Sequence, residues 1–176
     1  MHNKINIKGE VFITLKKSNG EVVNEYVHNV VTNEGKEFLT KKIFESNSDA
    51  RIAQIGVGTN DTAHTVNDTI TTFNDNSPAF VIKKDIDTQS SAIQTSPPVD
   101  NIITYIATFF DTEADTLGGG TPVAMKEIAL IGYSNDTPYE EVLVCRTTFN
   151  DDDTPAEGFL KSAQDIVTIT WKLTIN

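Results

Sequence analysis

Apolar and polar residues alternate most regularly near the two ends of the chain. Over residues 5–15 the odd positions are apolar apart from Gly9, and over residues 167–175 the odd positions are again apolar and include Trp171. A period of two places alternate side chains on opposite faces of a β-strand. Both segments are therefore predicted to be strands with one buried face, and Trp171 is predicted to lie in the core.

Further strands are predicted between these two. Ser18-Asn19-Gly20 is typical of a tight turn, so residues 21–30 are expected to return antiparallel to the first strand. The interior strands are expected at residues 52–59, 80–86, 101–110, 125–133 and 141–149. Residues 101–110 are apolar at both odd and even positions, which predicts a strand in the middle of the structure with both faces covered.

One helix is predicted, over residues 33–45. Thr32 or Asn33 can cap its first turn with a side-chain oxygen. Phe38, Leu39 and Ile43 fall on one face of this helix. We expect the helix to lie across an open end of the sheets and to cover their core.

Composition favours the same fold class. The chain has 23 Thr, 18 Ile and 14 Val but only 7 Leu, and residues branched at Cβ suit a pleated sheet better than a helix. Its 176 residues are the length of one domain, and no linker or internal repeat divides them. The sequence predicts a single domain, residues 1–176, that is mainly β: an antiparallel two-sheet β-sandwich with one short helix in its N-terminal third.

The charge is acidic and uneven. The chain has 25 acidic and 14 basic residues, a formal net charge of -11. Residues 1–88 carry 10 basic and 12 acidic side chains, whereas residues 89–176 carry 4 basic and 13 acidic ones. This predicts an acidic pole made by loops at residues 111–115 and 151–157. The acid excess argues against a nucleic-acid surface, which needs clustered Lys and Arg.

No membrane or export segment is visible. No stretch approaches the roughly 18 apolar residues of a membrane span, and the first residues lack the apolar segment of a signal peptide. We therefore expect a soluble chain that is made in the cytoplasm and has no membrane partner.

Gly56-Val57-Gly58-Thr59 is the segment nearest to a nucleotide-binding loop. A G-x-G-x-x-G fingerprint needs glycine where this chain has Asp61, and it needs a helix directly afterwards. The Asp61 carboxylate would also repel phosphate. We interpret the glycines as allowing a tight turn or a close approach between strands.

The acidic runs and the histidines are interpreted as structural. Residues 151–153 are all Asp, but the run lacks the spacing of a calcium-binding loop, and the same holds for the acidic residues at 111–115. We expect both to be solvated. His2, His28 and His64 lie in no metal-ligand motif.

The remaining chemistry-bearing residues receive the same interpretation. Cys145 is the only cysteine, which excludes an intrachain disulfide, and its apolar neighbours predict a packed, inert thiol. Glu127 and Arg146 interrupt apolar strands and are expected to form an ion pair, because buried charges rarely go unpaired. Asn-Asp-Thr triplets at Asn60, Asn67 and Asn135 are read as turns. We predict no catalytic, cofactor-binding or metal-binding residue, and no enzyme activity, cofactor or small-molecule substrate.

Taken in order, seven segments of the chain resemble a family of tailed-bacteriophage virion structural proteins. They include the N-terminal strand pair and the aromatic strand near residues 101–110. The other matching residues are Asn29-Val30-Val31 with Gly35, Gly56 to Thr59, Glu127 to Leu130, Arg146 with Phe149, and Asp165 to Trp171. The resemblance covers nearly all 176 residues. Departures from the family pattern at residues 70–77 and 111–121 fall in expected loops, so they bear on the partner more than on the fold.

The resemblance implies a β-sandwich that helps to build a virion. We expect an auxiliary or decoration protein that binds the capsid shell, because the chain has no coiled coil or collagen-like shaft such as a fibre needs. Its partners would be the major capsid protein or other virion proteins, and it would act as a homo-oligomer or in many copies. An alternative is a tail or head-fibre adaptor with the same fold. A third interpretation is a carbohydrate-binding module in which Trp171 and Tyr133 stack on a sugar.

The expected contact region is the N-terminal third of the chain. Residues 1–45 carry 7 basic and 6 acidic side chains, so they form its least acidic part, and they include Lys16 and Lys17. Packing many acidic poles together would be repulsive. The loops at residues 111–115 and 151–157 are therefore expected to face solvent in the virion.

Overall fold

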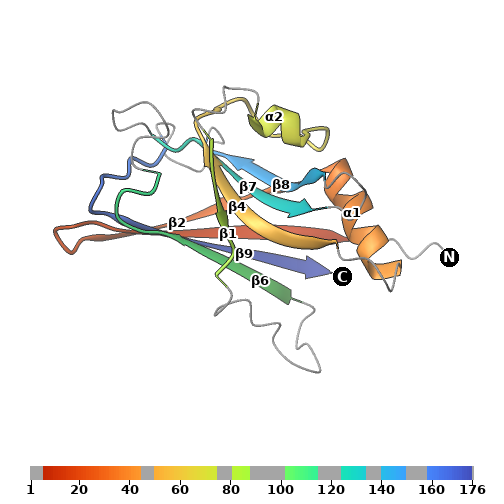
Figure 1. Cartoon of the computed structure of the whole chain (residues 1–176), viewed down its shortest axis with the longest axis horizontal. Coiled ribbons are helices and arrows are strands. Elements are labelled where there is room, and N and C mark those ends of the chain that lie inside the picture. Colours follow the sequence, from red (N-terminus) through yellow and green to blue (C-terminus); the bar gives the residue numbers. More distant parts are fainter. Residues whose placement is uncertain are drawn as a thin grey trace.

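The computed structural model describes residues 6–44, 50–74, 81–87, 102–114, 124–133, 140–149 and 158–175, which form two antiparallel sheets and two helices. Sheet A has the order β2 (Val22–His28), β1 (Ile7–Lys16), β9 (Ile166–Ile175), β6 (Ile102–Phe109). Sheet B has the order β3 (Val30–Val31), β8 (Glu141–Thr148), β7 (Glu127–Tyr133), β4 (Arg51–Gly58), β5 (Val81–Asp85). Figure 1 shows the sheets as two layers, and the predicted mainly β, two-sheet fold is confirmed.

The first and last strands pair with each other inside sheet A. The β1–β9 ladder runs without a break from Ile7 opposite Ile175 to Lys16 opposite Ile166. The odd-numbered residues from Gly9 to Leu15 on β1 and from Val167 to Leu173 on β9 are buried on the inner face, as their period predicts. The turn after β1 is confirmed at Gly20, whose positive φ of 89° suits glycine.

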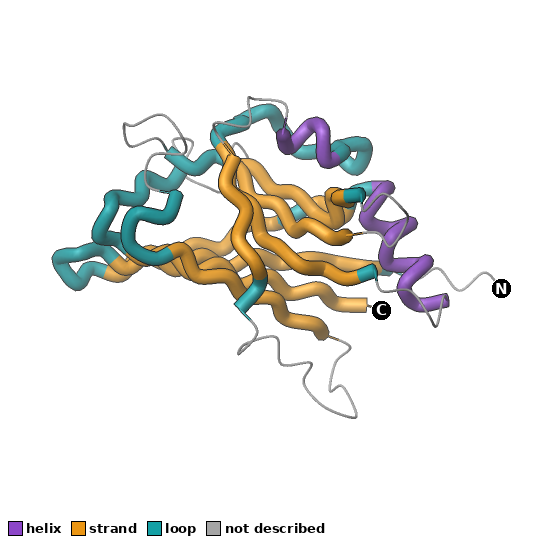
Figure 2. The backbone as a smooth tube through the Cα atoms, in the orientation of Figure 1, coloured by secondary structure: helices purple, strands orange, loops and turns teal. Residues whose placement is uncertain are grey.

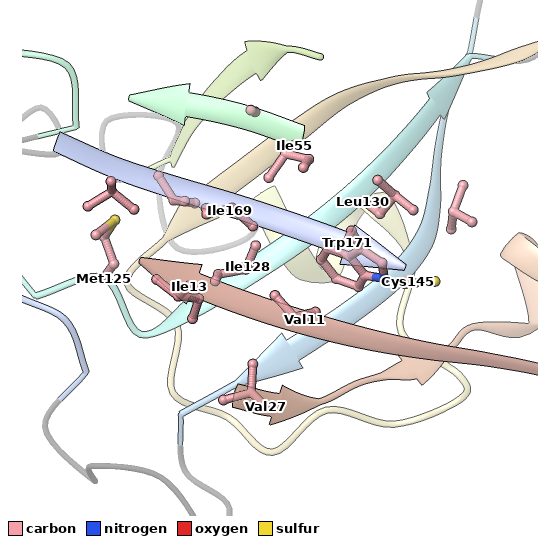
Figure 3. Packing of buried hydrophobic residues seen from close by; sticks show 14 of the residues in the cluster. Val11, Ile13, Val27, Ile55, Met125, Ile128, Leu130, Cys145, Ile169 and Trp171 are labelled. Carbon is pink, nitrogen blue, oxygen red and sulfur yellow. The ribbon is translucent and has the colours of Figure 1, made fainter. Parts of the chain in front are cut away.

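The core lies between the two sheets. Residues from sheet A such as Val11, Ile13 and Ile169 face Ile55, Ile128 and Leu130 from sheet B (Figure 3). Trp171 points from β9 into this space and is fully buried, so its predicted place in the core is confirmed.

Helix α1 (Asn33–Phe44) follows β3 directly. Thr32 is its cap, since Thr32 Oγ1 accepts a hydrogen bond from the Gly35 amide at 2.9 Å. Phe38 and Leu39 are buried, and the Phe38 ring occupies the space above Gly132 at the end of β7. The side chain of Ile43 lies outside the described residues. Figure 1 shows α1 at the end of the sandwich where β7 ends and β8 begins, as expected.

The predicted central position of residues 101–110 is wrong. Residues 102–109 form β6, which is an edge strand of sheet A. Tyr105, Ala107 and Phe109 join the core, while the even residues stay half-buried on the outer face. The backbone edge of β6 is partly satisfied from the other sheet, because the Asp87 amide after β5 donates to the Ile106 carbonyl at 2.9 Å. The outward apolar residues Ile102 and Ile106 therefore do not place this strand in the middle of the sheet.

A second helix, α2 (Ile70–Asn74), forms where the sequence suggested a loop. Thr69 and Thr72 exchange contacts across its first turn: the Thr69 amide donates to Thr72 Oγ1 at 3.2 Å. The helix sets Phe73 on the outer face of sheet B, in a small apolar cluster. That cluster comprises Phe73, Ala129, Ile131 and Leu143, with Ile70 and Val81 against it. None of the described helices is long and apolar enough to cross a membrane.

Candidate functional site

The most unusual chemistry of the described chain lies on the outer face of sheet B, beneath residues 59–74. Arg146 of β8 and Glu127 of β7 are both fully buried, and Arg146 Nε donates to Glu127 Oε2 at 2.8 Å. Arg146 Nη1 donates to Asp68 Oδ2, also at 2.8 Å. The predicted ion pair is confirmed, and Asp68 is a second carboxylate that the sequence analysis missed. We call these three residues the Arg146 network.

Strand register places the two strand residues of the network side by side. Ala129 of β7 lies opposite Arg146, and Glu127 lies opposite Thr148, so all of them share the outer face of sheet B. Opposite residues in an antiparallel pair have their side chains on the same face. The register therefore brings the guanidinium and the carboxylate to the same side of the sheet.

Turns in the segment after β4 hold the third member. The Thr65 amide donates to Asp68 Oδ2 at 3.0 Å, and Thr65 Oγ1 donates to Asp68 Oδ1 at 2.9 Å. The Asn60 amide donates to Glu127 Oε1 at 3.3 Å, while Asn60 Oδ1 accepts from the Thr62 amide at 2.9 Å. The turn predicted at Asn60 is thereby confirmed, and that at Asn135 lies outside the described residues.

The glycines of the candidate nucleotide loop belong to strand β4 and make room for neighbouring side chains. A Cβ atom at Gly58 would overlap the Glu127 carboxylate, and one at Gly56 would overlap the Phe73 ring. The space that glycine leaves is thus filled by the protein itself. The G-V-G pattern serves packing between β4, β7 and α2.

The two carboxylates of the network have opposite pKa shifts. Burial raises the pKa of Glu127 to about 7, although Arg146 and the Asn60 amide act in the other direction. Burial also opposes ionisation of Asp68, but the hydrogen bonds from Thr65 and Arg146 outweigh it and lower its pKa. The Asp68 carboxylate is therefore the main counter-charge of Arg146, whereas Glu127 is the carboxyl group of the network that titrates near neutral pH.

The contacts of the Arg146 network join different parts of the fold to one another. Arg146 and Glu127 are sealed from solvent, so they present no group to a substrate in this conformation. Their contacts instead tie residues 59–74 to β7 and β8. Arg146 Nη2 has no hydrogen-bond partner among the described residues. Breaking either of the two existing contacts would therefore leave the buried guanidinium with still fewer hydrogen bonds.

A second polar contact lies at the point where the chain crosses from sheet A to sheet B. Residues 21–30 were expected as one strand, but Asn29 separates β2 from β3. With the Asn29 amide nitrogen facing the Gly9 carbonyl, its oxygen accepts from Trp171 Nε1 at 2.9 Å. A Cβ atom at Gly9 would overlap Asn29. Gly9 therefore admits the amide that satisfies the buried indole.

Other candidate residues stay apart from one another. Cys145 is fully buried, and burial raises the pKa of its thiol, which agrees with the predicted inert role. His64 contacts Thr148, whereas His28 lies on the outer face of sheet A beside Tyr26. Across the described ranges, no group of three His, Cys, Asp or Glu residues could hold a metal ion.

The acidic loops are only partly described. Glu113 was expected to be solvated, but it forms an ion pair with Lys84 and accepts from the Phe110 amide at 2.8 Å. Asp111 is exposed. Asp115 and the loop at residues 151–157 lie outside the described residues.

Comparison with protein-family models, with curated proteins and with solved structures found no match to this chain. Several of the residues singled out in the sequence form contacts inside the fold, whereas Val30 and Thr59 are half-buried and Thr170 faces outward from sheet A. Asn29, Glu127, Arg146 and Trp171 form the two polar contacts described above, and Phe149 packs against Phe159 with ring centroids 5.2 Å apart. These landmarks therefore describe how the sandwich is held together.

Proposed function

We propose that this protein is a structural component of a tailed-bacteriophage virion, bound to the capsid shell as an auxiliary or decoration protein. The observation that carries the proposal is the ordered resemblance along nearly the whole chain. Its landmarks are spread over β3, β4, β7, β8 and β9, on both sheets. A resemblance of this kind concerns a complete domain rather than one local motif.

The form of the described domain suits a binding role. The described residues form two packed sheets with an apolar core between them, and a β-sheet domain can bind through an edge, a face or its loops without a pocket. Its partners would be the major capsid protein or neighbouring virion proteins, and the chain would be present in many copies or as a homo-oligomer. The proposed location is the virion, after synthesis in the host cytoplasm.

The carbohydrate-binding alternative loses its main residue. Trp171 is fully buried and its indole N–H is bonded to Asn29, so it offers no face to a sugar. Tyr133 is half-buried, and its hydroxyl donates to Gln54 Oε1 at 2.9 Å.

The number of copies per virion tests the proposal. Quantitative mass spectrometry of purified virions, calibrated against the major capsid protein, should give hundreds of copies for a shell protein. A few copies to a few dozen would assign the chain to the tail or to head fibres, which is the alternative with the same fold. Absence of the chain from purified virions would exclude a structural role in the virion.

A further inference from the structure

No helix in the described part of the chain covers the outer face of sheet A, whose exposed residues lie on β1 and β2. Both helices pack against sheet B: α1 and α2 each contact β8, and neither lies over sheet A (Figures 1 and 2). The register aligns outward residues in rows across the four strands. Two of these rows are His28, Glu10, Lys172 and Thr104, followed by Tyr26, Phe12, Thr170 and Ile106.

Aromatic residues gather at one side of this face. The rings of Phe12 and Tyr26 are 5.0 Å apart, and Tyr26 meets His28 edge-on at the same distance. The Tyr26 hydroxyl donates to Glu10 Oε1 at 2.9 Å, which fixes the ring on the surface. Tyr26 is 38% exposed and Val22, on the same strand, is 51% exposed. Exposed aromatic residues held in place in this way are typical centres of protein interfaces.

The charge of this face is opposite to that of the chain. Lys8, Lys16 and Lys172 lie on it against the single acid Glu10, whereas the whole chain has a net charge of -11. Lys172 Nζ lies 4.7 Å from the centre of the Phe12 ring, and Lys8 and Lys16 lie at opposite ends of β1. Cations thus flank the aromatic centre. Two such faces from two copies would repel each other, so the charge favours an acidic partner.

The free edge of β2 is a poor site for adding another strand. Glu25 lies opposite the core residue Ile13, which places a carboxylate on the inward side of the edge strand. Inward charges on edge strands are a common protection against pairing with another chain. Binding through the broad face is therefore favoured over extension of the sheet at β2.

We propose that the outer face of sheet A is the docking surface of this protein, and that its partner is an acidic protein surface with an apolar centre. The inference rests on the proposed function, and it identifies that partner as an acidic patch on the capsid shell. It also changes the expected contact region: Lys172 belongs to the C-terminal strand, and Lys17 is paired with Glu21 at 3.1 Å. The docking surface is thus defined by sheet position rather than by the N-terminal third of the chain.

The test uses the purified chain and shells from phage that lack its gene. Sedimentation measures the fraction of wild type, Lys172→Glu, Tyr26→Ala and the control Lys36→Glu that binds. Lys36 is an exposed lysine of α1, so it matches the charge reversal while leaving sheet A unchanged. We expect Lys172→Glu and Tyr26→Ala each to weaken binding at least about fivefold, and Lys36→Glu to bind like wild type. Emission of Trp171 confirms that each variant is folded.

Salt concentration distinguishes the electrostatic contribution of Lys172 to binding from the contribution of the Tyr26 ring. The loss caused by Lys172→Glu should shrink between about 0.1 M and about 1 M salt, where the screening length falls from about 10 Å to about 3 Å. The loss caused by Tyr26→Ala should persist.

Three outcomes would overturn the inference. If wild type binds the shells and both sheet A variants bind equally well, the shell is recognised by another surface and the proposed function still stands. If wild type does not bind the shells, the proposed function fails and the inference fails with it. Binding of wild type to single-stranded poly(dT) but not to shells would assign the basic, aromatic face to nucleic acid instead.

Discussion

Gly58 of β4 lies directly opposite Glu127 of β7, and the side chain that Gly58 lacks is replaced by the Glu127 carboxylate. This relationship explains why a glycine stands at the end of a buried strand. It also links the G-V-G pattern to the Arg146 network, although Gly58 and Glu127 are 69 residues apart in the sequence. The glycine makes the ion pair possible, and the ion pair then fixes residues 59–74.

Replacing Gly58 by Ala should therefore act through Glu127. The added methyl group would displace the carboxylate from Arg146 and from the Asn60 amide, at a cost of about 2–4 kcal/mol in the free energy of unfolding. Urea unfolding measures the loss. Gly20→Ala is the control, because nothing lies within 4 Å of its Cβ position and only its positive φ opposes the change, at a cost of about 1 kcal/mol. Equal losses for both variants would contradict this account.

Removing the cation of the network should be costlier. Arg146→Met leaves Glu127 and Asp68 as buried carboxylates without their counter-charge, and breaking a buried pair in this way costs about 3–5 kcal/mol. Chemical unfolding near pH 7.5 is the appropriate measurement. A loss below about 1 kcal/mol would show that the pair contributes no more than an exposed one.

The network predicts how stability depends on pH. Burial gives Glu127 a pKa of about 7 in the folded state against an ordinary value of 4.5, so the folded state holds a proton that the unfolded state releases between these values. The proton on Glu127 therefore adds to the free energy of unfolding below about pH 4.5. This contribution, up to about 3 kcal/mol, is lost as the pH rises through about 7. At lower pH, protonation of Asp68 and Asp165, whose pKa values are lowered in the fold, should destabilise the protein.

Glu127→Gln isolates this effect. The variant should show a flatter dependence of unfolding free energy on pH than wild type between about pH 4.5 and 7, because it cannot bind the extra proton. Both curves should still fall together in stronger acid. Parallel curves over the whole range would show that Glu127 keeps the same charge in the folded and unfolded states.

The contact between Asn29 and Trp171 predicts a separate, local effect. Asn29→Ala removes the acceptor of the buried indole N–H, which should cost about 1–3 kcal/mol while Trp171 stays in the core. Its fluorescence should therefore remain blue-shifted in the folded variant, and added oligosaccharides should not quench it. A red-shifted emission in native Asn29→Ala would mean that the amide holds the ring in place rather than merely satisfying it.

Much of the fold follows from local patterns. The period-two alternation on β1 and β9 identifies their buried faces, because the inner side of sheet A faces the core and the outer side does not. The position of β6 could not be read in this way, because its outward apolar residues Ile102 and Ile106 stay half-buried although β6 is an edge strand of sheet A. Helix α2 is five residues long, too short for a helical period to appear.

The site was only half visible in the sequence. Glu127 and Arg146 stand out because each interrupts an apolar strand. Asp68 lies in a polar segment full of Asn, Asp and Thr, where one acidic residue has nothing to mark it. The hydrogen bonds between Thr65 and Asp68 form only when residues 59–74 fold over sheet B, so the sequence does not show them. The aromatic face of sheet A was hidden for a related reason, because it joins Phe12, Tyr26 and Lys172 from three strands.

The measurement that tests the proposed function most directly is a cryo-electron microscopy reconstruction of virions produced by cells that carry the gene for this chain. We predict density for the nine described strands on the outside of the capsid shell, with the outer face of sheet A toward the shell and the loop near Asp111 toward solvent. A shell without this density, in virions that otherwise appear complete, would contradict the account.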